Sequence, residues 1–101
     1  MVTARVFRCE CTAFGLECDR VIDLGGQEPG TAWAALLWVS WRAGHIADQL
    51  DPPAARPVRA WLADDREAGR ALAQLNAGES YLLIIADGAT RYVLSATPVP
   101  S

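Results

Sequence analysis

The stretch SYLLIIADGATRYVLSAT, residues 80–97, contains two apolar runs on either side of Asp87-Gly88. This dipeptide adopts the positive φ angles of a tight turn, so the stretch predicts a C-terminal β-hairpin. The first run is apolar at both odd and even positions, which is typical of a strand covered on both faces. We therefore expect this strand to lie in the interior of its sheet.

A second hairpin is predicted over residues 4–24. In ARVFRCECTA the odd positions are small or apolar and the even positions polar, which is the alternation of a half-buried strand. A two-residue turn at Phe14-Gly15 would place Cys11 opposite Cys18 and Phe7 opposite Ile22. This register is preferred because it keeps the apolar side chains of both strands on one face.

Two helices are expected between the hairpins. The first runs from about residue 32 to 50 and has Thr31 as its N-cap. The second follows Asp64, which resembles the capping residue of a capping box with Glu67, and ends at Gly78. DPPAARP, residues 51–57, reads as a short, stiff connector, and PVRAWL, residues 57–62, fits either a helical turn or a short strand.

These elements predict the α+β class. We expect one antiparallel sheet built from the N-terminal and the C-terminal hairpin, with the two helices packed on one face. A chain of 101 residues is sufficient for one modest core, so residues 1–101 are expected to form a single domain.

The composition limits the classes of partner and the location. The chain has twelve carboxylates and nine basic residues, and all nine are arginine. The abundance of alanine and the lack of lysine are typical of a GC-rich coding sequence, which suggests a bacterial or phage source. The arginines are interleaved with carboxylates and form no basic stripe, which argues against direct nucleic-acid binding. No apolar run suits a membrane span and the first residues do not resemble a signal peptide, so we expect a cytoplasmic protein without a membrane partner.

All three cysteines fall within FRCECTAFGLEC, residues 7–18. Zinc sites usually need about four ligands in closely spaced pairs, and His45 is the chain's only histidine. Cys9 and Cys11 share the apolar face of their strand, so we expect them in the core, where cysteine behaves as a small hydrophobe. A zinc-binding module using Cys9, Cys11 and Cys18 is the alternative, and otherwise no metal or cofactor is expected.

No catalytic residues are predicted. The glycine loop in DLGGQEPGTAW has Thr31 where a phosphate-binding loop needs lysine, and Glu28 would repel phosphate. The sequence contains no G-x-S-x-G nucleophile motif and only one imidazole. These gaps lead us to expect that the protein is not an enzyme.

The helix at 32–50 carries the candidate binding residues. Its polar side contains Arg42 and His45, and Trp38 falls among them, outside the apolar arc that we expect to face the core. Tryptophan and arginine are enriched among interface hot spots, so the predicted partner-binding residues are Trp38, Trp41, Arg42 and His45. In the competing interpretation, Trp38 is covered by the 51–63 connector or by Trp61. The expected core arc comprises Trp33, Leu36, Leu37, Ser40, Trp41, Ala43, Gly44 and Ala47.

REAGRALAQLNAGESYLLIIADGATRYVLSA, residues 66–96, resembles the helix-then-hairpin of Phd/YefM-type antitoxins. The shared features are a leucine-bearing helix, a Gly-Glu pair, an apolar strand, a glycine turn and a second apolar strand. The resemblance implies a DNA-binding repressor. It covers under a third of the chain, and about 60 residues precede it here, whereas the element lies near the N-terminus in that family.

By elimination, we expect a small acidic protein-binding protein of the inhibitor, immunity or phage anti-defence type. It would act without catalysis, by occluding a protein or ribonucleoprotein partner that has a basic surface. The zinc-binding module and the antitoxin-like repressor are the two alternatives.

Overall fold

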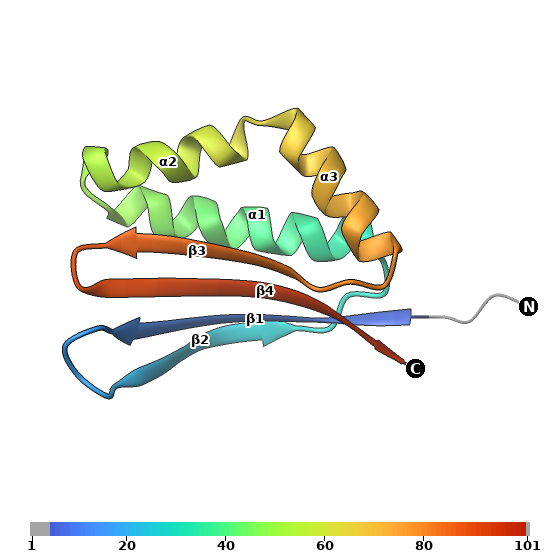
Figure 1. The fold of residues 1–101 in the computed structure, drawn as a ribbon, viewed down its shortest axis with the longest axis horizontal. Helices are drawn as coiled ribbons and strands as arrows, with labels where there is room; N and C mark the ends of the chain where they lie inside the picture. The colour runs from blue at the N-terminus through green and yellow to red at the C-terminus, as the bar shows by residue number, and fades with distance from the viewer. Residues whose placement is uncertain (1–4, 101) are drawn as a thin grey trace, which may run out of the picture.

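The computed structural model describes residues 5–100 and has the α+β architecture predicted from the sequence (Figure 1). Four strands form one antiparallel sheet in the order β2-β1-β4-β3, and three helices separate the two hairpins in sequence. The elements are β1 (Arg5–Gly15), β2 (Val21–Gln27), α1 (Ala32–Gln49), α2 (Pro52–Leu62), α3 (Asp65–Asn76), β3 (Tyr81–Asp87) and β4 (Thr90–Pro100).

The two hairpins meet at the centre of the sheet, where β1 pairs with β4. Their antiparallel register runs without interruption from Arg5 opposite Pro100 to Gly15 opposite Thr90. β2 and β3 flank this pair and form the two edges. The prediction of one antiparallel sheet built from two hairpins is therefore confirmed.

One face of the sheet carries the core. Phe7, Cys9, Cys11 and Ala13 of β1 are buried, whereas Arg8 and Glu10 between them are exposed. All three helices lie on the same side of the strands in Figure 1. Because successive side chains of a strand point to opposite faces, the odd residues of β1 can pack against the helices while the even residues face outward.

The pairing of the N-terminal hairpin differs from the prediction. β2 places Asp23 opposite Thr12 and Val21 opposite Phe14, so Cys11 and Cys18 are not neighbours across the hairpin. The cause is the long pairing of β1 with β4, which continues through Phe14-Gly15 and leaves no room for a turn there. In both the predicted and the observed register, the odd-numbered residues of β1 lie on one face of the sheet. Cys9 and Cys11 therefore still face the core.

Two expectations for the C-terminal hairpin also need correction. Asp87 is the last residue of β3 and pairs with Thr90, so the two turn residues are Gly88 and Ala89, and only Gly88 has a positive φ, of 57°. β3 lies at an edge of the sheet and not in its interior. Leu82 and Ile84 remain 56% and 57% exposed, because no described element covers the outward face of this strand.

The segment predicted as a connector is the helix α2, which raises the number of helices from two to three. Pro52 and Pro53 occupy its first turn, where a proline costs nothing because the N–H groups of those positions have no partner within the helix. Ala55 and Val58 then bury one side of the helix. The prolines therefore start a helix here and do not stiffen an extended linker.

The predicted helix ends are confirmed. Thr31 caps α1 by accepting a hydrogen bond from the Ala34 N–H at 3.0 Å. The Asp64 carboxylate accepts from the N–H groups of Arg66 and Glu67 at the start of α3. Gly78 follows α3 with a φ of 86°, the left-handed conformation that ends many helices. Within residues 5–100, no helix combines the length and the apolar character needed to cross a membrane.

Candidate functional site

α1 is the central helix of the layer that covers the sheet. It packs over β1 and β4, whereas α2 contacts β3 and α3 contacts both β3 and β4. Half of the buried residues of α1 are alanines, and small side chains let a helix approach the strands closely. Its buried residues are Ala32, Ala35, Leu36, Trp38, Val39, Ala43, Ile46 and Ala47.

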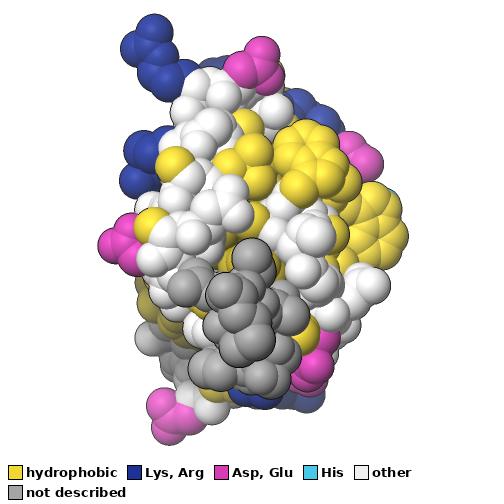
Figure 2. Space-filling view, turned by 90° about the vertical axis from the view of Figure 1, so that its right-hand side faces the viewer, with side chains coloured by type: hydrophobic (Ala, Val, Ile, Leu, Met, Phe, Trp, Pro, Cys, Tyr) yellow, Lys and Arg dark blue, Asp and Glu magenta, His cyan; other side chains and the backbone are white. Residues whose placement is uncertain are grey.

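A ridge of large apolar side chains runs along the outer side of α1. Trp33, Leu37 and Trp41 are spaced four residues apart and are 58%, 49% and 56% exposed. Side chains at this spacing are neighbours on a helix surface. We call these three residues the tryptophan ridge. Figure 2 views the end of the molecule where α1 begins and shows large hydrophobic side chains standing at the surface.

His45 and Arg42 adjoin the C-terminal end of the tryptophan ridge. The His45 ring lies edge-on to Trp41, with 4.4 Å between the ring centroids. The Arg42 guanidinium carbon is 5.8 Å from the centre of the Trp41 ring, within the range of a cation–π interaction. The structure therefore brings together three of the four predicted binding residues.

Trp38, the fourth, is only 8% exposed and belongs to the hydrophobic core. It is not available for contact with a partner, so its assignment to a binding surface is corrected. Conversely, Trp33, Leu37 and Trp41 were expected in the core arc and are exposed. The buried side of α1 thus combines four alanines with Leu36, Trp38, Val39 and Ile46.

A pocket of about 440 Å³ is lined by residues of α1 and of the strands β1, β2 and β4. We call it the α1–β2 pocket. Arg42, His45 and Gln49 of α1 contribute polar groups on one side, and Thr90 and Tyr92 of β4 contribute polar groups from the sheet. The remaining lining is apolar and consists of Ala13, Ile22, Leu24 and Ile46.

Arg42 is the one cation that lines this pocket. One of its Nη2 hydrogens is donated to the Leu24 carbonyl, whereas its Nε is buried without an acceptor in the described part of the chain. The ion pairs among the described side chains are Arg59–Asp48 and Arg70–Glu67, so the Arg42 charge has no carboxylate partner there.

The three thiols do not come together. Cys9 and Cys11 are fully buried, whereas Cys18 is exposed in the loop between β1 and β2. Burial raises the pKa of the Cys9 thiol to about 11, and it also raises the pKa of Cys11 against the opposing effect of the Arg42 charge. Over residues 5–100, no group of three or more histidine, cysteine or carboxylate side chains is placed to hold a metal ion, so the three-cysteine zinc alternative lacks its geometry.

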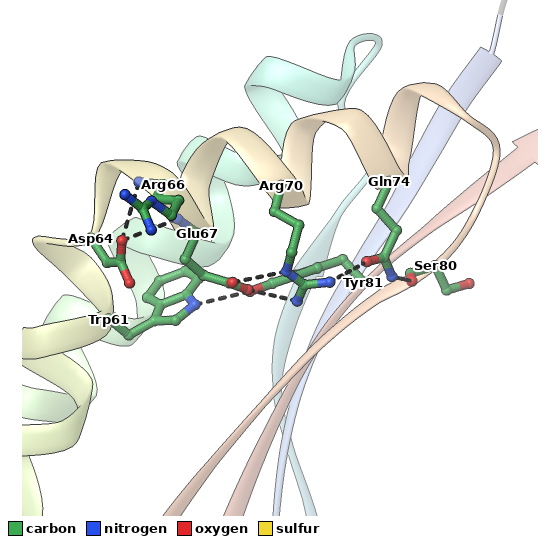
Figure 3. A network of polar contacts seen from close by, with 8 residues as sticks. All are labelled: Trp61, Asp64, Arg66, Glu67, Arg70, Gln74, Ser80 and Tyr81. Atoms are coloured by element: carbon green, nitrogen blue, oxygen red, sulfur yellow. Dashed lines mark hydrogen bonds and ion pairs between the residues drawn. The ribbon is translucent and has the colours of Figure 1, made fainter.

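A polar network that the sequence analysis missed joins α2, α3 and β3 (Figure 3). The Tyr81 hydroxyl donates to Glu67 Oε2 at 2.6 Å and accepts from the Trp61 indole N–H at 2.9 Å. Arg70 donates to both Glu67 oxygens, at 2.9 and 2.8 Å. The hydrogen bonds from Arg70 and Tyr81 lower the pKa of Glu67 to about 2. Both oxygens of this carboxylate already accept hydrogen bonds from Arg70 or Tyr81. The network therefore links α2, α3 and β3 and has a structural role.

Only the helix spacing in DREAGRALAQLN could have pointed to this network, because it places Glu67 and Arg70 on one face of α3. The pairing with Tyr81 depends on how α3 docks on the sheet. The Trp61 bond likewise depends on α2, which the sequence analysis did not foresee.

In comparisons with known proteins, no family model, no curated protein and no solved structure matches this chain.

Proposed function

We propose that this chain is a non-catalytic binding protein that occludes a surface of a protein partner by docking through the tryptophan ridge. The observation that carries this proposal is the exposure of Trp33, Leu37 and Trp41 in one row on α1. Isolated exposed apolar residues are ordinary, but a contiguous group of large ones marks an interaction surface.

Energetics support the ridge as the anchor of such a contact. A tryptophan can bury about 150–250 Å² on association, and tryptophan is among the residues that contribute most to interface energy. Both indoles are carried by a helix that is packed on the sheet, so little additional ordering would oppose binding. Arg42 and His45 at the end of the ridge would add polar contacts near the rim.

The charge of the chain favours a partner with a basic surface. The formal net charge is −3 at pH 7. Opposite net charges accelerate encounter and favour the correct partner more than they increase the final affinity. The rate of association should accordingly fall as salt is added, with a smaller change in the rate of dissociation.

The experiment is affinity capture with quantitative mass spectrometry from a bacterial or phage-infected lysate, using two matched variants. In the ridge variant, Trp33→Ser and Trp41→Ser remove two exposed indoles. In the control variant, Leu82→Ser and Ile84→Ser remove two equally exposed side chains from the outward face of β3. A partner that binds through the ridge is lost with the first variant and retained with the second.

The captured partner is then purified and titrated against each variant. We expect the ridge variant to bind at least about a hundredfold more weakly, since two hot-spot residues each contribute about 2 kcal/mol or more. Equal affinity of both variants, or loss through the β3 substitutions alone, would refute docking through the ridge. The partner's own activity is measured with and without the protein, and unimpaired activity at saturation would refute occlusion.

A further inference from the structure

We propose that the α1–β2 pocket binds a small molecule that carries a carboxylate or phosphate group on an apolar body. This proposal goes beyond docking through the tryptophan ridge, because the pocket contains none of the three ridge residues, although it shares Arg42 and His45 with the end of the ridge. Its volume of about 440 Å³ is within the range of ordinary small-molecule sites.

The anionic group follows from the state of Arg42. A guanidinium that is partly withdrawn from water loses hydration, and proteins usually compensate this loss with a carboxylate. Here the Leu24 carbonyl accepts from Arg42, the neutral Cys11 thiol lies close enough for the Arg42 charge to affect its pKa, and the buried Nε has no acceptor in the described part of the chain. Nη1 also donates no hydrogen bond to any described residue. Nη1 is not among the buried atoms, so a carboxylate or phosphate oxygen can reach it and give the guanidinium a charged partner.

The charges around the pocket point to the same class of ligand. The chain contains twelve carboxylates, yet none of them is among the residues that line this pocket. The lining therefore carries one positive charge and no negative charge, in a protein whose net charge is negative. Such an arrangement favours an anion at this position over the rest of the surface.

Further polar groups around the pocket are not used within the protein. The side chains of His45, Gln49, Thr90 and Tyr92 all line the pocket, and none of them hydrogen-bonds to another side chain or to the backbone among residues 5–100. They are therefore available to donate to the ligand from the two sides of the site. A few placed polar groups on an apolar lining are the usual composition of a small-molecule pocket.

The apolar body follows from the rest of the lining. Ile22 of β2 is among the exposed large apolar residues, and Leu24 is partly buried. Ala13 and Ile46 continue this apolar surface under α1. An alkyl or aryl group placed here would withdraw these side chains from water, and the burial of apolar surface stabilises the complex.

Three six-carbon probes test the proposal: hexanoate, hexyl phosphate and the uncharged hexanamide. Binding is followed by backbone amide chemical shifts and by tryptophan fluorescence, to which Trp41 beside Arg42 and His45 contributes. We expect hexanoate or hexyl phosphate to shift the residues that line the pocket and to bind at least about tenfold more tightly than hexanamide, because hydrogen bonds to charged groups contribute about 1.5–3 kcal/mol. Which of the two anions binds more tightly distinguishes a carboxylate site from a phosphate site.

The variant Arg42→Gln should lose at least about tenfold in affinity for the anionic probe. Arg59→Gln is the matched control, since Arg59 is an exposed arginine on α2 paired with Asp48, and it should bind as the parent does. If Arg42→Gln fails to fold, Gln49→Glu provides the second test. It adds a negative charge at an exposed lining residue, and we expect it to weaken anion binding several-fold at low salt, with less effect at high salt.

Equal binding of the acid and the amide would overturn the proposal. So would unchanged binding in both Arg42→Gln and Gln49→Glu, or chemical shift changes outside the pocket alone. These outcomes are separate from those of the capture experiment, which reports on the tryptophan ridge. Either proposal can therefore fail while the other stands.

Discussion

Trp38 and Trp41 lie three residues apart on α1, and their surroundings are opposite. Trp38 is part of the core, whereas Trp41 stands on the tryptophan ridge. Trp38→Ala should lower the free energy of unfolding by about 3–5 kcal/mol, because it leaves a cavity. Trp41→Ala should change it by less than about 0.5 kcal/mol. Urea unfolding of the two variants checks this difference, and similar losses would contradict it.

The cysteines give a second contrast between single residues. Cys18 is exposed, whereas Cys9 and Cys11 are fully buried. Since the thiolate is the reactive form, a thiol whose pKa is raised to about 11, as at Cys9, reacts slowly near neutral pH even when it is reached. We expect a thiol reagent to label one cysteine rapidly in the native protein and all three in denaturant. Cys18→Ser should abolish the rapid phase, and rapid labelling of two thiols would contradict the burial of β1.

At the scale of elements, the hydrogen bond from Tyr81 to Glu67 links β3 to α3. Its contribution to the stability of the fold should depend on pH. The pKa of Glu67 is lowered from its ordinary value of 4.5 to about 2. A lowered pKa in the folded state means that the ionised carboxylate stabilises the fold above about pH 4.5, and that this contribution is lost as the pH falls towards 2.

Glu67→Gln should therefore be less stable than the parent at neutral pH. The difference in stability between the two proteins should become smaller as the pH falls from 5 to 2. Thermal unfolding across this range measures the gap. Glu79→Gln removes an exposed carboxylate from the segment between α3 and β3 and serves as the control. A gap for Glu67→Gln that does not change with pH would contradict the assignment.

The pairing of β2 with β1 depends on the close approach of two backbones at Gly26. A Cβ atom at this position would lie 2.8 Å from the Cys9 carbonyl oxygen, and backbone cannot move aside as a flexible side chain can. Gly26→Ala should therefore destabilise the protein by about 1–3 kcal/mol. Gly30→Ala is the control, because a Cβ there meets nothing within 4 Å. Equal stability of the two variants would show that β2 can shift freely.

At the scale of the whole molecule, local signals predicted most of the elements. The caps Thr31 and Asp64 and the alternation of β1 each depend on a few neighbouring residues, and each was confirmed. The C-terminal hairpin was also confirmed, although its turn lies one residue later than predicted. The sequence also predicted that the two hairpins share one antiparallel sheet, but it did not predict the order of the strands or the register of the first hairpin. The β1–β2 register depends on β4, which lies far away in the sequence, and the edge position of β3 depends on which strands meet at the centre.

The candidate site likewise combines residues that could be predicted from the sequence with residues that could not. Arg42 and His45 could be selected from the sequence because they occupy the polar side of an apolar helix. The burial of Trp38 was one of the two interpretations that the sequence left open, but periodicity alone could not show that Trp33 and Leu37 are exposed. The α1–β2 pocket needs residues from β1, β2 and β4, so no single segment of the sequence contains it.

The pairing of β1 with β4 also has a consequence for how the protein folds. Arg5 pairs with Pro100, so the middle of the sheet cannot close until almost the whole described chain has been synthesised. Contacts this distant in sequence slow folding, because a long loop must be ordered before they form. During translation the first hairpin emerges from the ribosome with its apolar, cysteine-bearing face still open. Until β4 has emerged, this open apolar face and the unpaired edge of β1 make the incomplete chain prone to aggregation.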